Sequence, residues 1–343
     1  MATKTSRTES IRAFLLGNAA CHAEDLVRFA ATKFACSRQA MHKHVQKLIA
    51  EGVLTATGST RSRIYTLAVL AEWRQKWRLT KRLSEDEAWH QAVGPRLHDL
   101  ADNVRGIWLY GFSELFNNAI DHSQGTSIQV AIRRTGATTE MTLHDNGIGI
   151  FKKIQQALRL PDERLAALEL AKGKFTTDPS RHSGQGIFFS ARMFDEFRMV
   201  AGKVEFFRRH ATPEQWLVRE EGNAVGTCVT LVLANDSKRT TKVVFDRFST
   251  GDDYAFTTTS IPVRLLQIGK DALVSRSQAK RLLARAERFE HVLLDFTGVE
   301  SVGQAFADEV FRVFPLHHRD TLVEAVNGNA EVMRMVRRAL ASG

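Results

Sequence analysis

The sequence predicts a multidomain α+β protein, with a small basic helical domain, a larger α/β sandwich and a second small α/β domain. Three observations support this fold class. Helical periodicity and basic charge dominate the first part of the chain, and a long helix followed by alternating strand patterns fills the middle. Strands and helices alternate towards the C-terminal end. The predicted segments are 1–70, a helical connector at 71–95, 96–236, a linker at 237–257, and 258–343.

The composition indicates a globular chain in a reducing compartment. Its 343 residues are 43% hydrophobic and 25% charged, which is typical of globular domains. No apolar run approaches the ~18 residues of a membrane span, and the polar start lacks the apolar core of a signal peptide. The three cysteines are scattered without metal or redox spacing. We therefore expect a cytoplasmic protein without a membrane partner.

The net charge of +10 is concentrated near the N-terminal end. Residues 1–82 hold 15 Lys or Arg against 5 Asp or Glu, so the remaining residues balance to zero. A basic block on an otherwise neutral chain favours contact with a polyanion, most often nucleic acid. A solvated basic surface without a partner is the alternative.

Three helical runs followed by two short β-like pieces fill residues 8–70. Ser37 is placed to cap the third helix, and Met41, Val45 and Leu48 would form its inner stripe. This order resembles winged helix-turn-helix proteins, which implies a recognition helix in the DNA major groove and a basic wing near phosphate. A winged helix used for protein contacts is the alternative. The expected DNA-binding residues are Ser37, Arg38, Gln39, His42, Lys43, Lys47, Arg61 and Arg63.

The connector is expected to be helical because of its aromatic and capping patterns. Trp73 and Trp77 are four residues apart, which would place both on one helix face that packs between domains. Ser84 and Glu87 have the spacing of a capping box, which predicts a helix start at Ser84.

Polar residues interrupt an apolar helix in "GFSELFNNAIDHSQ", residues 111–124. Glu114 and Asn118 lie one turn apart on the same face. A side-chain amide oxygen suits Mg²⁺, and a carboxylate can accept a proton from an attacking water. Glu114 taken alone would be interpreted as a surface charge.

Two glycine-containing motifs follow this helix. "DNGIGI" ends a predicted strand, where Asp145 can accept the exocyclic amine of adenine while Gly147 and Gly149 let the backbone approach a purine. An ordinary Asp-Asn-Gly turn is the alternative. In "RHSGQGIFF", Gly184 and Gly186 open a helix whose N-terminal amides favour phosphate. The sequence contains no G-x-x-x-x-G-K-[ST] loop, which excludes P-loop nucleotide binding.

In this order the motifs resemble those of the GHKL ATPase superfamily, which includes gyrase, heat-shock chaperone, histidine kinase and mismatch-repair families. The resemblance implies ATP and Mg²⁺ as ligands, with Glu114 as the general base and Asn118 as the metal ligand. It also implies that Thr227 supports Asp145 in binding adenine. The remaining implied site residues lie on the same helix, in a lid or at the next helix start: Asp121, His122, Lys174, Arg181, Gly184, Gln185 and Gly186.

The resemblance leaves the reaction open. A histidine kinase would need a dimerisation hairpin, and His98 lies too close to Glu114 for one. The lid and the helix after it resemble anti-sigma-factor kinases, and residues 258–343 resemble STAS-like domains, which are the substrates of those kinases. The position of their acceptor serine is Ala305 here, preceded by Gln304. Alanine has no hydroxyl group and cannot be phosphorylated there.

The favoured interpretation is an ATP-dependent, DNA-binding transcription regulator that slowly hydrolyses Mg-ATP, with lid closure repositioning the flanking domains. The STAS-like domain would dock within the chain or on a partner protein. A serine kinase in a partner-switching system and an ATP-gated DNA clamp are the alternatives. The clamp is disfavoured because the second domain of clamp ATPases is missing. A homodimer stays open, since dimers are common in the superfamily.

Overall fold

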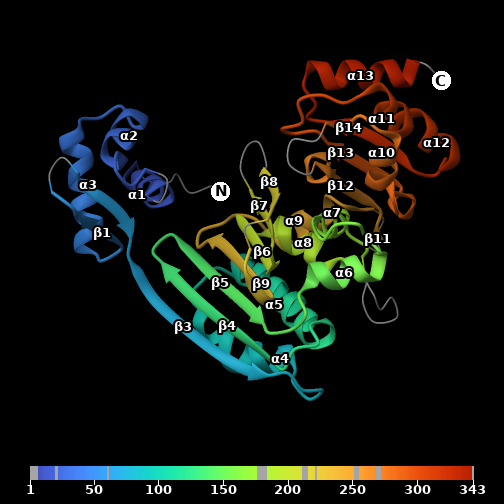
Figure 1. Ribbon diagram of the computed structural model, residues 1–343. Coiled ribbons are helices and arrows are strands. Elements are labelled where there is room, and N and C mark those ends of the chain that lie inside the picture. Colours follow the sequence, from blue (N-terminus) through green and yellow to red (C-terminus); the bar gives the residue numbers. More distant parts are fainter. Residues whose placement is uncertain are drawn as a thin grey trace. The chain divides into compact units, whose positions relative to one another are not determined.

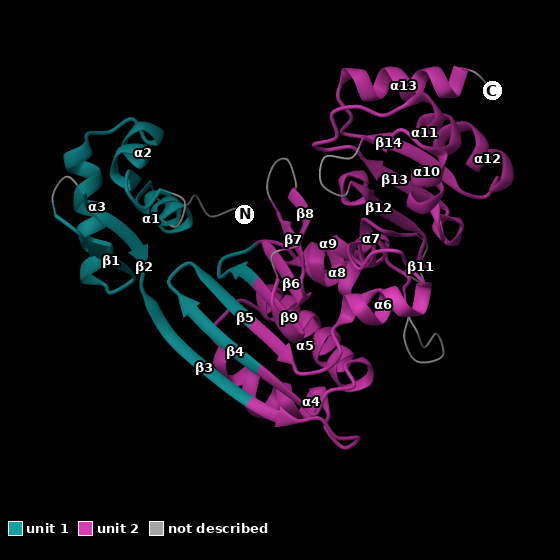
Figure 2. Ribbon diagram, in the orientation of Figure 1, with its two compact units in different colours: residues 1–75, 130–141, 232–237 teal, residues 76–129, 142–231, 238–343 magenta. Residues whose placement is uncertain are grey.

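The computed structural model describes residues 7–19, 22–59, 62–175, 184–210, 215–220, 222–250, 255–267 and 272–341. By the contacts between its residues, the chain forms two compact units (Figure 2). One comprises residues 1–75, 130–141 and 232–237, and the other comprises residues 76–129, 142–231 and 238–343. None of the helices within the described ranges is both long enough and apolar enough to cross a membrane.

The first unit contains three helices followed by an antiparallel hairpin, the order that the sequence predicts (Figure 1). The Ser37 hydroxyl accepts a hydrogen bond from Ala40 N at 3.1 Å and caps the third helix, as predicted. Met41, Val45 and Leu48 are buried in an apolar core that all five elements share, which leaves the opposite, basic face of that helix to solvent. The elements are α1 (Arg7–Asn18), α2 (Leu26–Lys33), α3 (Arg38–Ala50), β1 (Leu54–Thr57) and β2 (Ile64–Leu67).

A seven-stranded sheet has the strand order β3-β4-β5-β9-β6-β7-β8. Its strands are β3 (Val69–Arg78), β4 (Ser127–Thr135), β5 (Thr138–Asp145), β6 (Glu196–Gly202), β7 (Val204–Arg209), β8 (Gln215–Arg219) and β9 (Ala224–Ala234). Burial alternates along β4 and β5, as expected for strands with one covered face. On the opposite face of β6, β7 and β8, Glu205 pairs with Arg198 and with Arg219.

Helices pack against the covered face of this sheet. They are α5 (Asp102–His122), α6 (Ile150–Leu158), α7 (Arg164–Lys172) and α8 (Gly186–Met193). The predicted linker also contains packed structure, namely α9 (Thr241–Asp246), β10 (Ser249–Thr250) and β11 (Ala255–Phe256). Phe245 of α9 packs against Tyr110 and Phe189, with ring centroids 5.3 and 4.6 Å apart. Residues 237–250 and 255–257 therefore belong to the fold rather than only joining two domains.

The prediction of a helical connector is wrong for its first half, because residues 69–78 form β3. Trp73 and Trp77 still share one face, since a spacing of four residues fits the strand period of two as well as the helix period. Trp77 packs edge-on against Phe116 of α5, with ring centroids 5.6 Å apart. The predicted helix start at Ser84 is confirmed: its hydroxyl accepts a hydrogen bond from Glu87 N at the start of α4 (Glu85–Ala88).

The C-terminal part of the second unit is a small α/β domain with three parallel strands in the order β12-β13-β14. The alternation of strands and helices confirms the prediction, and Ala305 is exposed in the first turn of α11. The elements are β12 (Thr258–Pro262), α10 (Arg276–Leu283), β13 (His291–Asp295), α11 (Gln304–Asp308), α12 (Phe314–His317), β14 (Leu322–Val326) and α13 (Ala330–Ala341). A π-helical turn, Glu309–Val313, joins α11 to α12.

Candidate functional site

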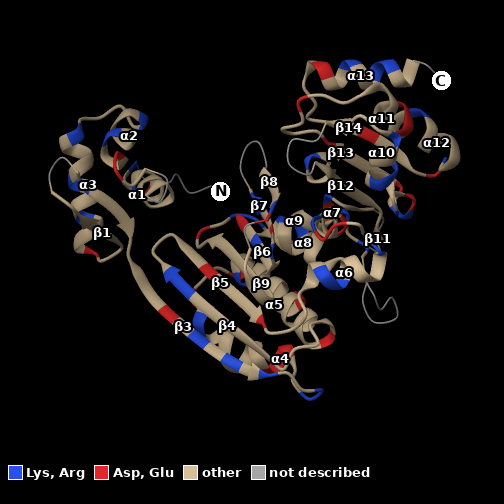
Figure 3. Cartoon of the chain, in the orientation of Figure 1, with Lys and Arg blue, Asp and Glu red and all other residues tan. Residues whose placement is uncertain are grey.

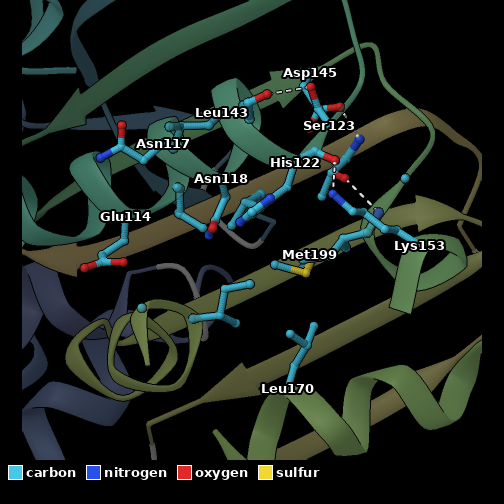
Figure 4. Close-up of a pocket in the computed structure, with 18 of the residues that line it drawn as sticks. Glu114, Asn117, Asn118, His122, Ser123, Leu143, Asp145, Lys153, Leu170 and Met199 are labelled. Carbon is cyan, nitrogen blue, oxygen red and sulfur yellow. Dashed lines mark hydrogen bonds between the residues drawn. The ribbon is translucent and has the colours of Figure 1, made fainter. Parts of the chain in front are cut away.

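A pocket of about 280 Å³ lies in the second unit, between α5, the covered face of the sheet and the starts of α6 and α8 (Figure 4). One part of its wall is apolar and is formed by Ile128, Leu143, Ile154, Met199 and Val229. Polar side chains from α5, the end of β5 and α6 form the rest. This division suits a ligand that combines a flat apolar ring with a polar or charged part.

The polar wall from α5 contains Glu114, Asn117, Asn118 and His122 (Figure 4). Glu114 and Asn118 therefore face the same pocket, as the sequence predicts. Asn117, for which the sequence indicated no role, lines it too. Tyr110 lies one turn before Glu114 and donates its hydroxyl to that carboxylate. Burial, together with the charge of Glu114, raises the pKa of Tyr110 far above its usual range, so this hydroxyl stays a donor.

Asp145 ends β5 and lines the pocket at a distance from Glu114 (Figure 4). Its Oδ1 atom accepts hydrogen bonds from Gly147 N at 2.8 Å and Thr227 N at 3.3 Å. The Thr227 hydroxyl accepts a further bond from Ile150 N at 3.1 Å, which ties β9 to the start of α6. Burial raises the pKa of Asp145, and the bonds from Gly147 and Thr227 partly oppose that rise. Thr227 thus contacts the Asp145 carboxylate mainly through its main-chain N, with a weaker contribution from the hydroxyl that the resemblance implies. The role of this contact in binding adenine stays a prediction.

Glycines allow close approaches beside both carboxylates. A Cβ atom at Gly186, the first residue of α8, would overlap the Glu114 carboxylate. At Gly226, which has φ +75°, a Cβ atom would overlap the main-chain oxygen of Asp145. A side chain at either position would displace the carboxylate-bearing residue, so both glycines shape the pocket.

Lys153 is a pocket-lining cation that the sequence reasoning missed (Figure 4). Its Nζ donates to the main-chain oxygen of His122 at 2.8 Å. Burial lowers the pKa of Lys153, and the nearby charge of Asp121 opposes that change. The available signal was its place in the first turn of the helix after Gly149, where it points back towards the end of α5.

Some predicted site residues lie near the pocket without lining it. Gly149, Gly184 and His122 do line it, whereas Gly147 and Asp121 do not. A Cβ atom at Gly147 would overlap the main-chain oxygen of Ser123, so this glycine allows the turn to pack against the end of α5. Asp121 is exposed on the last turn of α5.

The structure does not place the predicted lid residues Lys174 and Gln185 in the pocket wall. Lys174 is not part of the pocket wall, because its Nζ donates to Arg288 O of the C-terminal domain at 2.7 Å. Gln185 immediately precedes α8 and makes no side-chain cap there. Arg181 lies outside the described residues.

The predicted DNA-binding residues lie in the first unit, mostly on the exposed face of α3, where Figure 3 shows basic residues. Ser37, Arg38, Gln39, Lys43 and Lys47 are exposed. His42 is half-buried and lies 3.1 Å from the Gln46 side-chain amide. Arg63 is half-buried just before β2, and Arg61 lies outside the described residues. The basic surface of α3 is thus available for contact with a partner.

Comparison with protein families gives two matches, each covering part of the chain. Residues 110–237 match the histidine kinase-, DNA gyrase B-, and HSP90-like ATPases. Residues 278–333 match a STAS-like domain of unknown function, DUF4325. No curated protein matches the chain. The first match contains the whole pocket and supports ATP binding, together with an ATPase or kinase type of activity.

Proposed function

We propose that the chain is a DNA-binding regulator that binds Mg-ATP in this pocket, hydrolyses it slowly, and couples nucleotide state to DNA or partner binding. The match of residues 110–237 to GHKL-type ATPases supports the binding of ATP. The basic α3 face supports the DNA contact. The STAS-like match supports a protein contact through the C-terminal domain.

The observation that carries the proposal is the buried Asp145 carboxylate at the pocket wall. Two backbone amides hold its Oδ1 atom, which orients the group without requiring a cation. A carboxylate acceptor held in this way selects an exocyclic amine, as in adenine, over the carbonyl of guanine. The apolar wall beside it suits a purine ring.

The part of the pocket lined by Glu114 and Asn118 of α5 suits the phosphates of ATP. Asn118 provides a neutral oxygen of the kind Mg²⁺ takes together with phosphate oxygens, so the donor set fits the metal. Bound there, Mg²⁺ would withdraw charge from the phosphate that is transferred. Lys153 supplies a positive charge on the pocket wall. Glu114, restrained by Tyr110, accepts the proton of the attacking water.

Two isosteric substitutions test this assignment. Asp145→Asn should remove measurable ATP binding, because an amide places a donor where the adenine amine needs an acceptor. Glu114→Gln should keep ATP affinity but lower phosphate release at least about a hundredfold, the usual contribution of a general base. Titration calorimetry and a phosphate-release assay measure the two effects. Asp236→Asn, at an exposed site after β9, is the matched control. Wild-type affinity in Asp145→Asn would refute the nucleotide site.

A protein serine kinase acting on a separate partner is the second candidate. The STAS-like match favours it, because such domains resemble the substrates of anti-sigma-factor kinases. Ala305 is exposed at the position expected for the acceptor and carries no hydroxyl. Any phosphorylated serine at that position would therefore have to belong to another protein.

A further inference from the structure

Helix α7 connects the nucleotide-pocket domain to the C-terminal domain through buried charges. Glu169 and Lys172 are only 3% and 1% exposed. The Lys172 ammonium group donates to Glu169 Oε1 at 2.7 Å and to the main-chain oxygens of Arg281 and Ala284, each at 3.1 Å. The two main-chain acceptors belong to the end of α10, where a helix carries partial negative charge. All three donors of this lysine are used, and two of them bind the C-terminal domain.

The residues that follow Lys172 are held by the same domain. Thr259 of β12 donates its hydroxyl to the main-chain oxygen of Lys172 at 2.7 Å. Lys174 donates to Arg288 O, and its ammonium group lies 4.4 Å from the centre of the Phe289 ring. Arg288 returns a bond to the main-chain oxygen of Lys174 at 3.3 Å. Lys172 and Lys174, at the start of the predicted lid, are therefore anchored from outside the pocket domain.

Arg285 links this anchor to the pocket wall. It pairs with Glu169, and its guanidinium carbon stands 5.0 Å from the centre of the Phe175 ring. Phe175 lines the pocket. A Cβ atom at Gly184 would overlap the Phe175 backbone, so Phe175 also packs against the residues that precede α8. Arg285 thus contacts a residue that lines the same pocket as Glu114 and lies against Gly184, just before α8.

We propose that the C-terminal domain acts in cis on the nucleotide pocket, with Arg285 as a positioning residue that holds Phe175 against the pocket wall. The proposal rests on the nucleotide function proposed above. Because the docked C-terminal domain contacts Phe175 in the pocket wall, its docking changes the affinity of the pocket for nucleotide. Nucleotide binding must then alter docking as strongly as docking alters nucleotide affinity.

Charge balance makes Arg285 a suitable residue to change. Its removal leaves Glu169 and Lys172 as a hydrogen-bonded pair of opposite charges. Removing Glu169 would instead leave the buried Lys172 without its carboxylate, and removing Lys172 would take the donor from Arg281 O and Ala284 O. Arg285→Lys keeps a positive charge near Glu169 but removes the planar guanidinium over Phe175. Arg276→Ala is the matched control, since Arg276 is exposed in the same domain and pairs with Asp308.

The test measures the affinity for a non-hydrolysable ATP analogue and the hydrogen exchange of residues 184–193, the latter without nucleotide. Arg285→Ala and Arg285→Lys should each lower the affinity for the analogue about fivefold and speed hydrogen exchange in α8. In both variants, kcat at saturating ATP should change less than KM. Arg276→Ala should match the wild type in every readout. Melting temperatures establish that each variant is folded.

The outcomes separate the two proposals. Wild-type affinity and wild-type exchange in both Arg285 variants would overturn the positioning role while leaving the ATPase proposal intact. If the wild type binds no nucleotide, the ATPase proposal fails, and the exchange of α8 still decides whether Arg285 holds the pocket wall. Faster exchange in Arg276→Ala as well would also count against the inference, because the effect would not be specific to the contact with Phe175.

Discussion

At the scale of single residues, Asp145 has a property expected of a binding group rather than of a stabilising one. It is 7% exposed, and burial raises its pKa even though Gly147 and Thr227 donate to it. A folded-state pKa above the unfolded value means that the folded protein holds this proton more tightly than the unfolded chain does. The charged form therefore lowers the stability of the folded state at neutral pH, which fits the proposed role of Asp145 in ligand binding.

The pH dependence of stability tests this cost. Asp145→Asn keeps an acceptor oxygen for the amides of Gly147 and Thr227 but cannot ionise. Raising the pH through the elevated pKa destabilises only the wild type, because its folded state must then release a proton it binds preferentially. The melting temperature of Asp145→Asn relative to the wild type should rise between about pH 4 and pH 7. A difference that stays constant or falls across this interval would contradict the raised pKa.

At the scale of elements, β3 shows why an exposed edge strand is hard to predict from sequence alone. Most of its residues are exposed on both faces, so the apolar alternation that identifies a half-buried strand is missing. Its strongest signal, Trp73 and Trp77, fits a helix and a strand equally. Pairing with β4 decides the conformation, and that contact joins segments about 50 residues apart in the chain. By contrast, α3 carries its own capping residue and apolar stripe, and both were predicted correctly.

The exposed face of α3 gives a prediction for DNA binding. Arg38→Ala combined with Lys43→Ala should weaken binding to duplex DNA and reduce the slope of log affinity against log salt by about two, one for each lost phosphate contact. Fluorescence anisotropy over a salt series measures both. Arg28→Ala with Lys33→Ala removes the same charge from exposed positions of α2 and is the matched control. An equal loss in the control would indicate nonspecific attraction, and no binding by the wild type would favour a protein-contact role.

At the scale of the whole molecule, the open chemical question is the fate of the γ-phosphate. The chain contains a GHKL-type domain and a STAS-like domain, the two domain types that the kinase alternative assigns to the enzyme and to its substrate. The position expected for an acceptor serine holds the exposed Ala305, which cannot receive phosphate. Instead, α10 and the residues after it dock on α7 beside the pocket. This arrangement fits a regulatory domain better than a substrate.

ATP labelled on its γ-phosphate distinguishes the reactions. The pure protein should release labelled free phosphate and should not become labelled itself, because water is the acceptor in the reaction that we propose. Thin-layer chromatography and gel autoradiography of the same reaction measure the two products. Glu114→Gln should lower the free phosphate at least about a hundredfold, which excludes a contaminating ATPase. Label on the chain, or on an added partner protein with little free phosphate, would establish the kinase alternative.

Much of the site could be predicted because its motifs are local. Glu114 and Asn118 lie one turn apart on α5, and Asp145 with its glycines forms a continuous strand-to-helix turn. Lys153 and Asn117 were missed because their roles depend on which helix face meets the pocket. Phe175 was missed because it follows the end of α7 and lines the pocket through contacts with distant segments. Lys174 was expected near phosphate from its place in the lid, but the C-terminal domain provides its hydrogen-bond acceptor.

The sequence by itself determined the order of α1 to β2, the basic helix α3, the polar face of α5 and the Asp145 turn. Each of these follows from periodicity, capping or glycine placement within a few residues. Only the tertiary structure decided that β3 is a strand, that α9, β10 and β11 pack within the fold, and that Arg285 reaches Phe175. Those features depend on contacts between distant segments, whose free energy comes from burial and pairing that no local pattern records.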